Sequence, residues 1–154
     1  MRLSGREDID LGIDEAFAAA TDVAFLERQL LRRGIDVVRV DGLEAAGLGA
    51  AWRAEAGWGG RRYPLAIEAV EWSAPGAVAL LARSGGLSGN LRAELTALSR
   101  GQTRIRVTLD VKGAGFRDRM LLNSVALAKS RLSQKFAGVV SSFARDLETR
   151  AARA

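Results

Sequence analysis

The last quarter of the chain carries a single apolar stripe, and this stripe constrains the fold more than any other feature of the sequence. Residues 116–150 contain no proline and one glycine, Gly138. Apolar residues recur there in steps of three and four, the spacing of one face of an α-helix. The members of the stripe are Met120, Leu121, Val125, Ala128, Leu132, Phe136, Val139, Phe143 and Leu147. The stripe predicts one continuous helix, roughly 50 Å long, that needs an apolar surface to cover it.

Between residues 35 and 112 the pattern changes to short alternating segments separated by glycine turns, which is typical of strands. Turns at residues 59–60 and 99–101 predict two hairpins whose register can be read directly. The pairs set opposite each other are Trp52 and Ile67, Ala54 and Leu65, Ala56 and Tyr63, Leu95 and Ile105, Ala93 and Val107, and Leu91 and Leu109. Each hairpin then has one apolar and one charged face, as a half-buried antiparallel sheet requires.

The N-terminal part predicts a strand and two short helices. Residues 3–11 alternate between apolar and charged, while Asp14 and Asp22 are suitable N-caps for helices. The expected order is strand, two helices, six strands and a long helix. We therefore expect one α+β domain over residues 1–154, in which a curved antiparallel sheet of about seven strands wraps around the C-terminal helix.

The chain contains no cysteine and no histidine, which narrows the possible chemistry. Thiol catalysis, disulfides and thiolate metal sites are excluded, and the commonest general base and metal ligand are missing. No motif predicts a catalytic residue, a metal site or a bound cofactor. The N-terminus lacks the apolar core of a signal peptide and no apolar run could span a bilayer. We expect a cytoplasmic protein that does not insert into membranes.

The net charge is +5, and the basic excess lies largely in the final helix. Residues 117–153 contain eight Lys and Arg against three Asp and Glu. A basic helix can bind nucleic acid or an anionic membrane. Here the charges are spread along the helix and no aromatic residues alternate with them, so a solvated outer face is favoured and no nucleic-acid partner is expected.

The concave face of the predicted sheet mixes large apolar residues with alanines. This mixture is compatible with a cavity for an apolar molecule beneath the helix. It is equally compatible with a helix that approaches the sheet more closely. The residues expected to line the cavity are Trp52, Ala54, Trp58, Tyr63, Leu65, Ile67, Glu71, Leu80, Leu91, Ala93, Leu95, Ile105 and Val107 from the sheet, with Met120, Val125, Ala128 and Leu132 from the helix.

The convex face carries a predicted apolar patch where solvent would be expected. Continuing the hairpin register places Val70, Trp72 and Leu81 there, beside Ala77 and Ala79. Such a patch is typical of an oligomer interface, which predicts a homodimer through this face. The alternative is a register error of one residue, which would turn these side chains inward.

The order of elements resembles the helix-grip fold of the START/SRPBCC superfamily, which includes polyketide cyclase-like and lipid-transfer proteins. The segments that carry the resemblance are Asp14-Glu15-Ala16-Phe17 with Thr21-Asp22, Glu71-Trp72-Ser73-Ala74-Pro75, Gly85-Gly86-Leu87-Ser88-Gly89 and Gly101-Gln102-Thr103-Arg104-Ile105. One departure is Leu11-Gly12-Ile13, where the family usually has a proline before its first helix. The resemblance implies a pocket between sheet and helix for lipids, polyketides or quinone-like molecules, and it implies no catalytic residue.

Three functions are compatible with these features. A carrier or sensor of an apolar small molecule needs only the pocket, and it is favoured. A cyclase or dehydratase would use Tyr63, Glu71 or Glu7 as an acid or base, with a carboxyl pKa raised by burial. A protein- or ribosome-interaction module would use the basic helix and the patch around Trp72.

Overall fold

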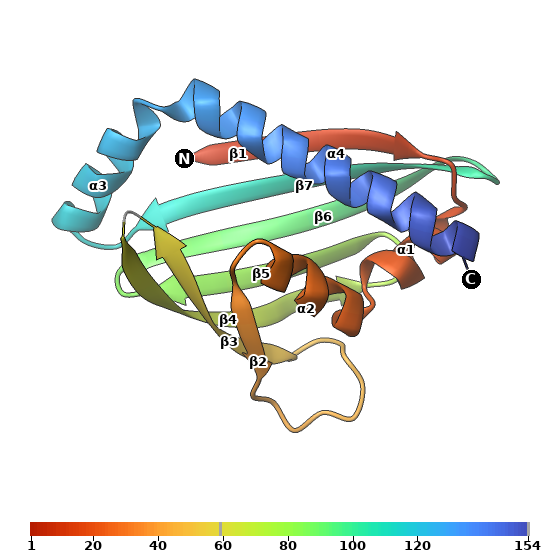
Figure 1. Ribbon diagram of the computed structural model, residues 1–154, viewed down its shortest axis with the longest axis horizontal. Helices are drawn as coiled ribbons and strands as arrows, with labels where there is room; N and C mark the ends of the chain where they lie inside the picture. Colours follow the sequence, from red (N-terminus) through yellow and green to blue (C-terminus); the bar gives the residue numbers. More distant parts are fainter. Residues whose placement is uncertain (59, 154) are drawn as a thin grey trace.

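Seven antiparallel strands form one sheet in a computed structural model that describes residues 1–58 and 60–153, without the side chains of Trp58 and Arg153. The strands lie in the order β1-β7-β6-β5-β4-β3-β2, and helices cover one face, called the inner face below (Figure 1). The strands are β1 (Arg2–Ile9), β2 (Asp36–Arg39), β3 (Ala51–Trp58), β4 (Arg61–Ser73), β5 (Ala77–Ser84), β6 (Leu87–Ser99) and β7 (Gln102–Gly113). The helices are α1 (Ile13–Ala20), α2 (Val23–Arg32), α3 (Phe116–Ala126) and α4 (Lys129–Arg153). The predicted α+β fold is confirmed.

Both hairpin registers read from the sequence are observed. In the β3–β4 hairpin Trp52 pairs with Ile67, and in the β6–β7 hairpin Leu95 pairs with Ile105. The charged residues Glu94 and Arg106 lie opposite each other on the outer face. Turn geometry and apolar alternation together specify these pairings, because a slip of one residue would expose every apolar side chain.

The two N-terminal helices begin in different ways. The side chain of Asp22 accepts a hydrogen bond from the Phe25 N–H at 3.1 Å, as expected for an N-cap. Asp14 is not a cap, because α1 begins one residue earlier, at Ile13, after an extended Gly12. A carboxylate in the first turn still lies near the positive end of the helix dipole.

The prediction of one continuous C-terminal helix is wrong, because the helix breaks at Leu127 and Ala128. There the N–H groups of Leu127 and Ala128 bond to the carbonyls three residues earlier. The hydroxyl of Ser124 also donates to the Met120 carbonyl at 3.2 Å, an interaction that bends helices. The bend separates α3, which lies against the end of β7, from α4, which runs along β1 (Figure 1).

The C-terminal half of α4 anchors the helical layer on the sheet. Val140, Ala144 and Leu147 are buried there in a cluster with side chains of α1, α2, β6 and β7. Gly5 lies directly beneath Val140, and a Cβ at Gly5 would be 2.9 Å from the Cβ and Cγ2 atoms of Val140. Glycine therefore allows α4 to approach β1 closely. No described helix is long and apolar enough to cross a membrane.

A β-bulge in β4 reverses the orientation of the strand after Ala69. Ala69 pairs with Leu80, but Glu71 pairs with Ala79, so Val70 is an extra residue. Trp72 consequently turns to the inner face and packs against both buried clusters, and Glu71 turns to the outer face. The expectation that Trp72 belongs to an outer apolar patch with Val70 and Leu81 is wrong, and the patch loses its largest member.

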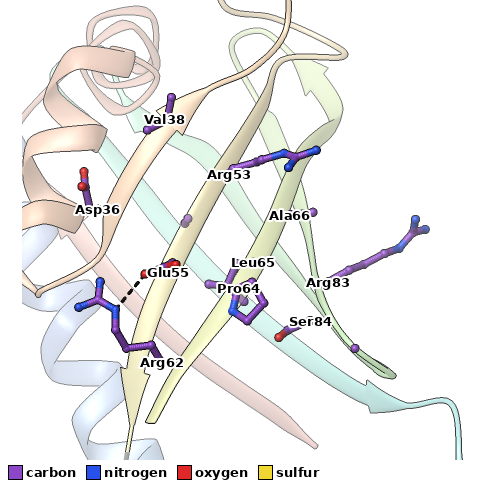
Figure 2. A pocket seen from close by; sticks show the side chains of 12 residues that line it. Asp36, Val38, Arg53, Glu55, Arg62, Pro64, Leu65, Ala66, Arg83 and Ser84 are labelled. Atoms are coloured by element: carbon purple, nitrogen blue, oxygen red, sulfur yellow. Dashed lines mark hydrogen bonds and ion pairs between the residues drawn. The ribbon is translucent and has the colours of Figure 1, made fainter. Parts of the chain in front are cut away.

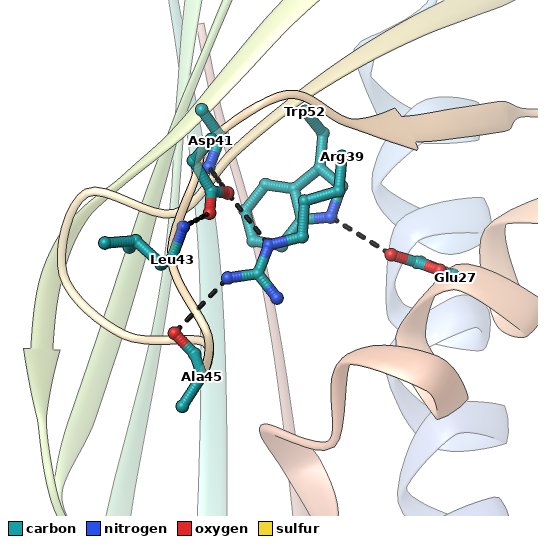
Figure 3. A network of polar contacts seen from close by, with 7 residues as sticks. Glu27, Arg39, Asp41, Leu43, Ala45 and Trp52 are labelled. Atoms are coloured by element: carbon teal, nitrogen blue, oxygen red, sulfur yellow. Dashed lines mark hydrogen bonds and ion pairs between the residues drawn. The ribbon is translucent and has the colours of Figure 1, made fainter.

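A polar network holds the long loop between β2 and β3 in place (Figure 3). The carboxylate of Asp41 accepts hydrogen bonds from the Ala51 N–H at 2.7 Å, the Leu43 N–H at 2.9 Å and the Arg39 Nε at 2.8 Å. Arg39 also donates to the Ala45 carbonyl. The hydrogen bond from Arg39 and then those from the backbone hold the pKa of Asp41 well below its usual range.

Candidate ligand-binding surface

The inner face of the sheet is arranged in rows that run across the strands. One row joins Trp52, Ile67, Ala82, Gly89 and Val111 from β3 to β7. The neighbouring row, with Leu80, Leu91 and Leu109, has longer side chains. Ala82 and Gly89 are the smallest residues in the middle of the face and lie between larger apolar neighbours, with Leu109 and Val111 next to Gly89.

Several residues predicted to line a cavity belong to the packed core instead. Leu95, Ile105 and Val107 are buried beneath α1, α2 and α4. Trp52 and Ala54 are also buried, and the Trp52 indole Nε1 donates to Glu27 on α2 at 3.3 Å (Figure 3). These five side chains contribute to stability and offer no free surface to a ligand.

A second group of predicted residues remains partly exposed. Leu65, Ile67, Leu80, Leu91 and Ala93 are half-buried on the inner face. Ile67 and Leu80 border the buried cluster under α2, and Leu91 and Ala93 border the one under α4. These residues mark the boundary between the packed core and a more open region.

The open region lies on the sheet near α3, and we call it the open inner surface. Tyr63 is 40% exposed there, and its other members are half-buried and belong to neither buried cluster. The open inner surface consists of Tyr63, Leu65, Ala82, Gly89, Leu109 and Val111. Of these, Ala82, Gly89, Leu109 and Val111 were absent from the predicted lining, although the β6–β7 register already placed Leu109 opposite Leu91 and Val111 opposite Gly89.

The four predicted lining residues of the C-terminal helical segment differ in exposure. Val125 and Leu132 are half-buried, whereas Met120 and Ala128 are exposed. Met120 lies on the solvent side of α3 because a helix of this length turns only one face to the sheet. Trp58, also predicted to line the cavity, has its side chain outside the described part of the chain.

Three polar side chains of the sheet that could have served a ligand site have different environments. The Thr103 hydroxyl is buried and donates to the Leu11 carbonyl at 2.7 Å, which is a structural role. Glu71 is on the outer face, where its two oxygens accept hydrogen bonds from Arg92 at 3.1 Å. The expectation that Glu71 lines the cavity is therefore corrected. Tyr63 remains at the edge of the open inner surface, with the Arg61 guanidinium 5.9 Å from its ring centroid.

Two hollows with a measurable volume lie away from the open inner surface. The first has about 620 Å³ and lies on the outer face of β2–β5, where Figure 2 shows Arg53 and Arg83 extending to the same side and Arg62 paired with Glu55. The second has about 530 Å³ and lies between the start of α1 and the β6–β7 turn. Neither is the cavity predicted between the sheet and the helix. Within the described residues no group of three acidic side chains is placed to hold a metal ion.

Comparisons with known proteins bear on the fold. No protein-family model and no curated protein sequence matches the chain. A conserved protein from Geobacillus kaustophilus superimposes with a TM-score of 0.69 at 15% identity, covering 99% of this chain and 96% of that one. The Zhui aromatase/cyclase from Streptomyces sp. R1128 gives 0.65 at 14% identity, with 94% and 93% covered. Ara h 8.0201 gives 0.59 at 16% identity, with 100% and 99% covered. The chain thus shares the helix-grip fold of these structures.

Proposed function

We propose that the protein binds an apolar small molecule on the open inner surface, between the sheet and the helices α3 and α4. One observation supports this most directly: half-buried apolar side chains surround the small residues Ala82 and Gly89. Apolar side chains exposed together on an inward-curving face are typical of ligand sites. A lipid, polyketide or quinone-like compound has the matching chemistry.

The edge of this surface offers a polar end for the ligand. Tyr63 presents a hydroxyl and Arg61 a guanidinium beside the same ring. A few polar groups at the margin of an apolar site usually fix the orientation of the bound molecule. We therefore expect a ligand with an apolar body and an acidic or phenolic end, held at Arg61 and Tyr63.

Binding is favoured over cyclase-type catalysis by the position of the candidate acids. Glu71 faces away from the open inner surface and is paired with Arg92. Glu7 lies on β1, opposite Ile105 in the packed end of the sheet. Tyr63 is left as the acid–base candidate that borders the open inner surface.

The first test is native mass spectrometry of freshly purified protein, with extraction of any bound apolar molecule. The second is titration with the dye 1-anilinonaphthalene-8-sulfonate, which has an apolar body and an anionic end. Replacing Ala82 by leucine puts a large side chain in the middle of the open inner surface and should weaken dye binding about ten-fold or more. The matched control is Ala24→Leu, the same enlargement at an exposed position of α2 that lines neither of the two hollows.

Dye affinities of the two variants can be compared directly if both unfold cooperatively on heating, because both are then folded. We expect Ala24→Leu to bind the dye as the unchanged protein does. Equal dye affinity for Ala82→Leu and Ala24→Leu would show that the open inner surface is not the binding site. The Tyr63→Phe variant separately tests the polar end and should weaken binding several-fold.

A further inference from the structure

Helix α3 exposes apolar side chains on the side that faces away from the sheet. Phe116, Met120 and Leu127 are 72%, 51% and 92% exposed, whereas Leu122 and Val125 are half-buried on the opposite side. Leu127 keeps a helical backbone, with φ −62° and ψ −26°. At about 100° per residue, spacings of four and seven align the three exposed side chains. We call this line of Phe116, Met120 and Leu127 the α3 strip.

Basic residues flank the α3 strip on both sides. Helical geometry places Arg117 and Arg119 about 80° to either side of the line. Lys129 and Arg131 follow directly after the bend. Residues 116–135 contain five basic residues and one acidic residue. An exposed apolar line between rows of cations is uncommon on a surface that faces only water.

The single acidic residue of this segment, Asp118, points toward the sheet. Its carboxylate accepts a hydrogen bond from the Gly115 N–H at 3.2 Å and lies against Gly86. It caps the start of α3 and stays away from the strip. The outward side of α3 is therefore apolar and positively charged among the described residues.

We propose that the α3 strip docks on the surface of a lipid bilayer with anionic headgroups. The three apolar side chains enter the boundary between headgroups and acyl chains, and the flanking Arg and Lys residues contact the phosphates. Interfacial helices bind membranes by the same combination of apolar burial and electrostatic attraction. The helix lies on the membrane and does not cross it.

The position of α3 suits this role. Figure 1 places α3 and its turn into α4 at one end of the molecule, with α1 and the C-terminus at the other end. Docking through this end leaves the rest of the sheet in water. It also brings the open inner surface, which lies beside α3, close to the lipid. The docking itself does not require that the open inner surface binds a ligand.

The test is flotation of the protein with vesicles of pure phosphatidylcholine or of phosphatidylcholine with about one third phosphatidylglycerol. We expect binding to the anionic vesicles, weak binding to the neutral ones, and loss of binding at high salt. The double variant Phe116→Ser/Leu127→Ser should weaken binding about ten-fold or more. Its control, Leu31→Ser/Leu48→Ser, changes two leucines that are 61% and 67% exposed elsewhere and should bind normally.

The contribution of the flanking basic residues to vesicle binding is tested by the same flotation experiment. Arg117→Glu/Arg119→Glu should reduce binding to anionic vesicles at least ten-fold. The exposed pair at the end of α2 supplies the control Arg32→Glu/Arg33→Glu, which changes the net charge equally. Equal losses in both pairs would show that only overall charge matters and would overturn the proposal.

A site-specific reporter is available because the chain has no cysteine. An environment-sensitive nitrobenzoxadiazole label at Leu127→Cys should brighten and shift to the blue when anionic vesicles are added, and one at Leu31→Cys should not. No change at Leu127→Cys would overturn the proposal. The proposal would also be overturned if the unchanged protein were a dimer that does not bind vesicles and the Phe116→Ser/Leu127→Ser variant were a monomer. That result would assign the α3 strip to contact between copies of the chain. Dye titration of Ala82→Leu is independent of all these outcomes.

Discussion

At the scale of single residues, Asp41 shows how one carboxylate can organise a loop. Its side chain is only 8% exposed and accepts hydrogen bonds from Arg39 and from the backbone of Leu43 and Ala51. These bonds join the end of β2, the first part of the loop and the start of β3. The charged form of Asp41 is favoured by all three donors, so its pKa is lowered.

This shift predicts a pH dependence of stability. Unfolded Asp41 binds a proton near its ordinary value of 3.8, and the folded residue binds one only at lower pH. The free energy of unfolding contributed by Asp41 is therefore complete at neutral pH and decreases as the pH falls below about 4. Urea unfolding between pH 7 and pH 2.5 should show a smaller loss of stability for Asp41→Asn than for the unchanged protein. The exposed Asp36, changed to Asn, serves as a control and should keep the full loss.

At the scale of elements, the bulge at Val70 decides which side chains β4 presents to the core. If Val70 were paired as an ordinary strand residue, Trp72 would face outward and Glu71 inward, as strict alternation predicts. With it, the indole packs in the core and the carboxylate pairs with Arg92. Both side chains gain a suitable environment from one local irregularity.

Deleting Val70 should therefore be tolerated far better than deleting Ala79 from the regular strand β5. Without Val70 the strand alternates regularly, with Glu71 still facing outward and Trp72 still facing the core, so this deletion should cost less than about 2 kcal/mol. Without Ala79, one of its neighbours Val78 and Leu80 must turn to the outer face, at a cost of about 3 kcal/mol or more. Urea unfolding and the wavelength of tryptophan emission measure both effects. Equal stability of the two deletion variants would contradict the account of the bulge.

At the scale of the whole molecule, the helices are fixed at two places. Near the C-terminus, Arg150 pairs with Asp22 and lies 4.8 Å from the Phe25 ring centroid, which ties α4 to the start of α2. Near its middle, α4 rests on β1 through Val140 and Gly5. Toward its start α4 is less buried, and the sheet beside α3 is open. The closed core and the open inner surface thus occupy opposite ends of one sheet.

The contact of α4 with β1 can be tested with two glycine-to-alanine changes. Gly5→Ala places a Cβ 2.9 Å from Val140, so α4 must move and stability should fall by about 1–3 kcal/mol. Gly138→Ala adds a Cβ that meets nothing within 4 Å in an exposed part of α4, and it should raise stability by up to about 1 kcal/mol. Chemical denaturation gives both values. A stable Gly5→Ala variant would mean that α4 is not in close contact with β1.

The sequence alone was sufficient for the order of elements and for the hairpin registers. Trp52 opposite Ile67 and Leu95 opposite Ile105 follow from a short turn and from apolar alternation, which are local properties. The same reasoning gave the wrong faces for β4 beyond Ala69, because no residue near Val70 indicates a bulge. Trp72 faces inward because the buried clusters there provide a place for its indole.

The candidate site depended still more on tertiary structure. The apolar stripe of residues 116–150 correctly identified helix, but its periodicity could not reveal the bend at Leu127, which arises from hydrogen bonds of Ser124 and its neighbours. It also could not tell which apolar residues would be covered. Leu95 and Leu65 both face inward, yet Leu95 is buried and Leu65 is half-buried, because α4 contacts the β1 side of the sheet. Periodicity gives the face of an element, whereas burial depends on the element packed against it.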